Sequence, residues 1–67
     1  MLRLLKQGER MRKLRGERTT REVAEKLGIS ESSYVKYERG ERNPGDNVKV
    51  KIANFYKVTV QYIFFAD

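Results

Sequence analysis

The sequence predicts an all-α fold of five short helices, because helical apolar spacing, helix caps and turn glycines alternate along the whole chain. In residues 2–15 the apolar side chains that recur at helical spacing are Leu4, Met11 and Leu14. Gly8 interrupts this pattern, so we expect the first helix to begin near Gly8 and residues 2–7 to be a frayed extension. Gly16 provides a C-terminal cap.

Residues 19–39 contain two short helices joined by a sharp turn. Thr19 and Glu22 have the spacing of a capping box, which starts one helix. Gly28 permits the positive φ that a tight turn needs, and Ser30 is expected to cap the next helix, with Ser33 at the reciprocal position. Small or apolar residues are expected beneath both helices: Val23, Ala24, Leu27, Ile29, Tyr34 and Tyr37. An ordinary helical hairpin is the alternative, but this combination is typical of a helix-turn-helix unit.

Gly40 is expected to end the third helix, and residues 41–45 form a loop around Pro44. A fourth helix should follow, capped by Asp46 or Asn47. Its apolar stripe consists of Val48, Ile52, Ala53, Phe55 and Tyr56, and Lys57 closes it.

Thr59 is expected to cap a last short helix that carries several apolar side chains. These are Val60, Tyr62, Ile63, Phe64 and Phe65. Residues 58–65 are also rich in β-branched and aromatic residues, which favours a strand. A helix is preferred, because a lone strand has no partner in an otherwise helical chain.

Composition limits the possible functions. The 67 residues suggest one domain spanning residues 1–67, with a small core. Neither cysteine nor histidine is present, which argues against disulfides, thiolate or imidazole metal sites, and triads built on these residues. We expect no cofactor, metal or small-molecule ligand, no membrane span or secretory signal, and a cytoplasmic location.

The net charge of +6 favours a polyanionic partner. Nine basic and four acidic side chains give residues 1–27 a net charge of +5. Residues 28–47 carry three and four, a net of −1, and residues 48–67 add +2. If nucleic acid is the ligand, the first two helices should supply much of the attraction for phosphate. Mixed charge on solvated helix faces would explain the same numbers, so charge alone decides nothing.

Four segments resemble the Cro/C1-type (XRE) helix-turn-helix family of phage repressors and bacterial regulators. The resemblance covers about residues 8–65 and is strongest in these strings: GERMRKLR at 8–15, REVAEKLGIS at 21–30, YERGERNP at 37–44 and KIANFYKV at 51–58. It implies a compact five-helix, lambda-repressor-like domain that binds operator DNA as a dimer, through a recognition helix in the major groove.

Three positions depart from the family pattern. The first turn, residues 15–19, is two residues shorter than the common form. Thr20 stands where many members carry a phosphate-contacting glutamine. Tyr34 stands where isoleucine or valine is usual, so either the core beneath the third helix is reshaped or the tyrosine hydroxyl reaches the surface.

The resemblance also implies which residues touch DNA. The positions facing the major groove are Ser30, Glu31, Ser32, Val35 and Lys36. Serine, glutamate and lysine side chains can hydrogen-bond to base edges, and valine can pack on a thymine methyl. Ser30 and Glu31 have an alternative role as the cap and first-turn acid of their helix. The positions expected at the sugar-phosphate backbone are Thr20, Arg21, Arg39, Arg42 and Asn43. Solvated loop charge is the alternative for the last three.

Two further roles are structural. The resemblance implies that Glu38 pairs with an arginine of the first helix, either Arg12 or Arg15. Near the C-terminus, Tyr62, Phe64 and Phe65 are the residues expected at a dimer interface. Because neighbouring helical residues point about 100° apart, Phe64 and Phe65 cannot both face the core. One of them should therefore meet a second subunit.

Three classes of function remain open from the sequence. The first is a dimeric, sequence-specific DNA-binding transcriptional regulator, most readily a repressor that binds an inverted repeat. The second is a protein-interaction module, such as an antitoxin or anti-repressor partner, that uses the same fold. An enzyme is the weakest, because paired carboxylates such as Glu22 and Glu25 are explained by a solvated helix face.

Overall fold

The computed structural model describes residues 2–65, which form five α-helices and no strand within that range. The helices are α1 (Leu2–Arg15), α2 (Thr20–Leu27), α3 (Glu31–Glu38), α4 (Asp46–Tyr56) and α5 (Val60–Phe64). The all-α prediction is confirmed. The strand alternative for residues 58–65 is wrong, since Thr59 caps α5 by accepting a hydrogen bond from the Tyr62 backbone N–H at 3.0 Å.

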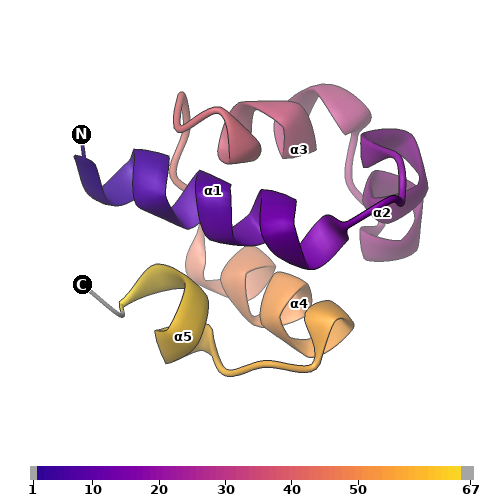
Figure 1. Ribbon diagram of the computed structural model, residues 1–67. Coiled ribbons are helices and arrows are strands. Elements are labelled where there is room, and N and C mark those ends of the chain that lie inside the picture. Colours follow the sequence, from indigo (N-terminus) through magenta and orange to yellow (C-terminus); the bar gives the residue numbers. More distant parts are fainter. Residues whose placement is uncertain (1, 66–67) are drawn as a thin grey trace.

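Helix α1 crosses the middle of the molecule, with α3 on one side of it and α4 and α5 on the other (Figure 1). It packs on α3 and α5, while α2 packs on α3 and α4. Arg10 ties α1 to the end of α5, because its guanidinium donates a hydrogen bond of 2.9 Å to the Ile63 carbonyl oxygen. All five helices thus surround one core. Its buried members are Met11, Val23, Ala24, Leu27, Tyr34, Tyr37, Ile52, Ala53, Tyr56, Ile63 and Phe64.

Helix α1 does not begin near Gly8, contrary to the prediction from the sequence. It is continuous from Leu2 to Arg15, and Gly8 lies in its middle. The reason is a close approach of two helices, because a side chain at Gly8 would overlap the backbone carbonyl of Glu38, the last residue of α3. The glycine therefore serves packing rather than helix termination.

The helix ends otherwise follow local sequence signals, with one correction. Gly16 and Gly40 follow α1 and α3 with φ of +60° and +75°, as expected for residues after a helix. Helix α4 is capped by neither Asp46 nor Asn47; its N-cap is Gly45, which has no side chain to offer, and Asp46 is the first helical residue. As an acid in the first turn, Asp46 instead stabilises the positive end of the helix dipole.

No helix within residues 2–65 combines the length and the apolar character needed to cross a bilayer.

Candidate nucleic-acid interface

The helix-turn-helix is built by three local devices between residues 19 and 33. The Thr19 hydroxyl accepts a hydrogen bond of 3.0 Å from the Glu22 backbone N–H, and the Glu22 carboxylate accepts one of 2.9 Å from the Thr19 N–H. This capping box also lowers the pKa of the Glu22 carboxyl, because the charged form accepts the bond. Gly28 takes φ +74°, which turns the chain sharply after α2.

The third device is the cap of α3. The Ser30 hydroxyl accepts a hydrogen bond of 3.1 Å from the Ser33 backbone N–H and also meets the Ser33 hydroxyl at 3.0 Å. Beneath the two helices, Ala24 is 1% exposed and allows α2 and α3 to approach. The predicted capping residues and inner residues of both helices are confirmed.

Helix α3 turns a mixed polar and apolar face outward. Glu31 and Ser32 are exposed, whereas Val35 and Lys36 are partly exposed. Lys36 makes no side-chain hydrogen bond or ion pair within residues 2–65, so its ammonium group is available to a ligand. Donor, acceptor and methyl groups thus stand together on one short helix, which is the chemistry that base edges require.

The first turns of α2 and α3 are joined by a side-chain contact that the sequence did not predict. The Thr20 hydroxyl donates a hydrogen bond of 2.8 Å to a carboxylate oxygen of Glu31. Both residues were predicted to contact DNA separately, but the structure couples them. A carboxylate held in this way has its position at the start of α3 fixed by α2. No pattern within either helix could reveal this link.

The basic residues expected at the DNA backbone are partly engaged within the chain. Arg21 pairs with Glu25 at 3.7 Å and Arg39 pairs with Glu41 at 3.8 Å, and all four side chains are exposed. Exposed pairs of this kind contribute at most about 1 kcal/mol, so a phosphate can replace the carboxylate. Arg42 is exposed and has no charged partner among the described residues.

Asn43 is held by α1 rather than standing free in its loop. Its side-chain oxygen accepts a hydrogen bond of 3.5 Å from the Gln7 amide, and Gln7 is buried. The loop after α3 is therefore anchored on the first two turns of α1, a segment that the sequence predicted to be frayed. Gln7 was not among the residues predicted to support the candidate interface. The sequence feature that could have indicated it is its position next to Gly8.

Glu38 pairs with Arg15, one of the two partners that the resemblance implied. The Arg15 Nε and Nη2 groups donate hydrogen bonds of 2.7 and 3.0 Å to the two Glu38 carboxylate oxygens, whereas Arg12 lies at 4.0 Å. The side chain of Glu38 is only 4% exposed, and hydrogen bonding to it raises the pKa of the Arg15 guanidinium. This bidentate pair joins the end of α1 to the end of α3.

Of the two outcomes considered for Tyr34, the reshaped core is the one observed. Tyr34 is 0% exposed, and its hydroxyl lies 2.6 Å from the hydroxyl of Tyr56 on α4. Burial raises the pKa of both phenols, because the charged form loses its water. Helix α3 thereby gains a polar link to α4 where an aliphatic side chain would give none.

The residues expected at a dimer interface do not share one environment. Phe64 is 1% exposed and belongs to the core of the monomer. The prediction that it lies at a dimer interface is therefore corrected. Tyr62 and Phe65 are 52% and 51% exposed. The Lys49 ammonium lies 5.0 Å from the centre of the Phe65 ring and covers part of it. The expectation that only one of the two phenylalanines faces the core is confirmed.

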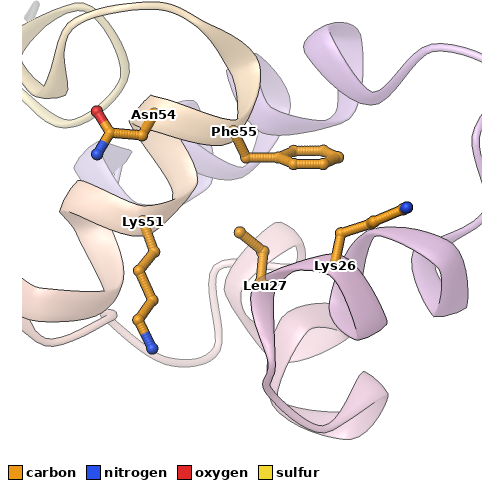
Figure 2. A pocket seen from close by; sticks show the side chains of 5 residues that line it. All are labelled: Lys26, Leu27, Lys51, Asn54 and Phe55. Carbon is orange, nitrogen blue, oxygen red and sulfur yellow. The ribbon is translucent and has the colours of Figure 1, made fainter.

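A shallow pocket of about 440 Å³ lies between α2 and α4. Figure 2 shows Phe55 and Leu27 on opposite sides of it, with the Lys26 and Lys51 side chains pointing away from one another. Its lining consists of Lys26, Leu27, Lys51, Asn54 and Phe55. None of the residues expected to contact DNA lines this pocket, so it is separate from the candidate interface.

Comparisons with known proteins identify relatives that are named HTH-type transcriptional regulators. The chain is 34% identical over 62 residues to the HTH-type transcriptional regulator ImmR of Bacillus subtilis, and 40% identical over 57 residues to the uncharacterized HTH-type transcriptional regulator YobD of the same organism. These alignments cover 90% and 82% of this chain but 49% and 51% of the two regulators. The chain therefore spans about half the length of the curated relatives it matches. No solved structure matches it.

A family model described as helix-turn-helix matches residues 9–63, which include all of α2, α3 and α4. The match agrees with the capping box, the left-handed Gly28 and the Glu38–Arg15 pair. The chain belongs to the Cro/C1-type (XRE) helix-turn-helix family.

Proposed function

We propose that this chain binds double-stranded DNA sequence-specifically through α3 and regulates transcription, as a repressor. The observation that carries the proposal is the outward face of α3, where Ser32, Val35 and Lys36 are accessible on a helix presented by a helix-turn-helix. The names of the related Bacillus subtilis proteins support a regulatory role. Repression needs only occupation of the operator, and such a regulator would act on DNA in the cytoplasm.

In this proposal the interface has two parts with different tasks. The base-reading part consists of Ser30, Glu31, Ser32, Val35 and Lys36. The phosphate-binding part consists of Thr20, Arg21, Arg39, Arg42 and Asn43. Phosphate contacts fix orientation and give salt-dependent affinity, whereas contacts to base edges give sequence preference.

The Thr20–Glu31 hydrogen bond adds a consequence for base reading. Glu31 accepts the Thr20 proton through Oε2, which leaves Oε1 to accept from a base, and cytosine N4 is the matching donor in the major groove. We expect Thr20→Val, which keeps the shape but removes the donor, to weaken the preference at the base pair that Glu31 reads. Equal preference in the wild type and this variant would show that Glu31 acts only on its own helix.

We propose that the functional form is a homodimer on an inverted repeat. Tyr62 and Phe65 are each about half exposed near the end of the described chain, and exposed aromatic side chains of this kind are suited to a two-fold interface. Two recognition helices should then read half-sites about 34 Å apart. Phe65→Ser should give a folded, monomeric protein with weak DNA binding, whereas Phe64→Ser should be broadly destabilised. If sedimentation shows Phe65→Ser still dimeric at micromolar concentration, the interface lies elsewhere.

The test of the function begins with selection of bound duplexes from a random DNA pool. Lys36→Ala and Arg42→Ala are then compared on the selected duplex and on its single-base-pair variants. Lys36→Ala should cost about 1–3 kcal/mol and relax preference at particular positions, while Arg42→Ala should weaken all duplexes alike and reduce the salt slope by about 1.

A protein-interaction module predicts a different result. It would show no salt-sensitive, sequence-selective shift of any duplex, together with tight binding to a protein partner. That outcome would overturn the DNA-binding proposal.

A further inference from the structure

We propose that Tyr56, which lies on α4 outside the helix-turn-helix, is a positioning residue for the recognition helix α3. Its hydroxyl acts through Tyr34, so it influences DNA recognition without touching DNA. The predicted effect on DNA recognition rests on the proposed function. The effect of Tyr56 on the position of α3 can be tested without DNA.

The basis is a buried pair of tyrosine hydroxyl groups that joins α4 to α3. Tyr34, Tyr56 and Glu38 are 0%, 8% and 6% exposed, and the two tyrosine oxygens are 2.6 Å apart. Burial is the main cause of the raised pKa of Tyr34, and the Tyr56 hydroxyl and the Glu38 carboxylate raise it further. No buried side-chain polar atom among the described residues lacks a partner.

Each tyrosine hydroxyl has one proton to donate and lone pairs that accept, so one of the two donates to the other across the 2.6 Å that separates them. Glu38 is held from a different side, because its carboxylate accepts two hydrogen bonds from Arg15. The inner face of α3 is therefore tied to α4 through Tyr34 and to α1 through Glu38.

Tyr34 and Tyr56 come from helices that pack mainly on other partners. Helix α3 packs mainly on α1 and α2, and α4 mainly on α5 and α2. The hydroxyl pair is thus a side-chain bridge from α4 to the inner face of α3. Tyr34 and Glu38 are one turn apart, and together with Tyr37 they are the buried residues of this helix.

A displacement of that inner face would move the outer face as well. Helix α3 has eight residues, a length of about 12 Å, so it moves as one rigid piece. A binding site of this kind must be held to about 0.5 Å and about 10–20° to keep its hydrogen bonds. Tyr56 contacts the buried side of α3, away from Val35 and Lys36, and it can alter base reading only through this displacement.

The test compares Tyr56→Phe with a matched control, Tyr37→Phe. Tyr37 is 9% exposed, close to the 8% of Tyr56, but its hydroxyl makes no hydrogen bond within residues 2–65. Both substitutions remove one oxygen. The measurements are urea unfolding, backbone amide chemical shifts of the free protein, and affinity for the selected duplex and its single-base-pair variants.

We expect Tyr56→Phe to remain folded and to shift the amide signals of Val35 and Lys36 more than Tyr37→Phe does. Its ratio of affinities for the selected duplex and the variants should fall by about fivefold, which corresponds to one hydrogen bond of about 1 kcal/mol. The salt slope should stay unchanged, because no phosphate contact is lost.

The proposal is overturned if Tyr56→Phe loses stability but keeps wild-type amide positions in α3 and wild-type discrimination. If Tyr56→Phe fails to fold, the double variant Tyr34→Phe/Tyr56→Phe replaces it, since removal of both hydroxyls leaves no unpaired one behind. Wild-type discrimination by that folded double variant overturns the proposal too. A wild-type protein without sequence preference would instead refute the proposed function, and the amide shifts would still decide the role of Tyr56.

Discussion

Replacement of Gly8 by alanine tests how closely α1 and α3 must approach. In an isolated helix this change is favourable by about 1 kcal/mol, because glycine costs more backbone entropy than alanine. In the folded protein Gly8 lies against the backbone of Glu38. A methyl group there would overlap the Glu38 carbonyl oxygen and lie 2.7 Å from the carbonyl carbon. Helix propensity therefore predicts that Gly8→Ala stabilises the protein, whereas packing predicts that it destabilises the protein.

The packing effect is the larger of the two. Carbon atoms in contact prefer a separation of about 3.5–4.0 Å, so the helices would have to separate by about 1 Å. The obstacle is backbone, which cannot rotate away as a side chain could. Overpacking of this kind costs about 3 kcal/mol at the upper end of its usual range. After the propensity gain, we expect a net loss of about 2 kcal/mol and a Tm lower by about 8–16 °C.

Thermal unfolding followed by circular dichroism measures this effect, with Gly45→Ala as the control. Gly45 has φ −69° and nothing within 4 Å of the position that a Cβ would occupy. The control should change stability by less than about 1 kcal/mol. A Gly8→Ala protein that melts at or above the wild-type temperature would refute the close approach of α1 and α3.

Two further predictions concern pH. The folded-state pKa of Glu22 is lowered from 4.5, so the stability that its bond to Thr19 contributes is present at neutral pH and lost as pH falls below about 4.5. The difference in unfolding free energy between the wild type and Glu22→Ala, measured by urea unfolding, should therefore shrink in acid. The folded-state pKa values of Tyr34 and Tyr56 are raised from 10.0, so stability should fall as pH rises above about 10, where the unfolded chain loses these protons first. Tyr34→Phe/Tyr56→Phe should show less of this alkaline loss, and an equal loss in both proteins would contradict the assignment.

The parts of the fold that the sequence predicted are those with local causes. Thr19, Ser30 and Thr59 cap their helices through backbone groups three residues away, and Gly28 adopts the positive φ that the turn needs. The predicted start of α1 was wrong because its cause is distant. Gly8 meets Glu38, far along the chain at the end of α3, and no local pattern distinguishes a glycine that ends a helix from one that permits close packing.

The candidate site also has features that the sequence predicts and features that it does not. The outward positions of α3 follow from helical spacing, so Ser32, Val35 and Lys36 could be predicted before the structure. The contacts that hold the interface could not, because the Thr20–Glu31 and Gln7–Asn43 hydrogen bonds join residues 11 and 36 positions apart. They depend on how helices are placed, which side-chain type alone does not determine.

Helix α3, the proposed recognition helix, has little reason to be a stable helix on its own. Its sequence, ESSYVKYE, is eight residues long, and a helix of this length is marginal in water even with better helix formers. Its geometry must therefore come from tertiary contacts at three levels: Thr20 at its start, Tyr56 at its middle and Gly8 at its end. Each of these contacts is made by a residue outside α3. Consequently, substitutions of Tyr56 and Gly8 should alter DNA recognition as readily as substitutions on the outward face, but with the salt slope preserved.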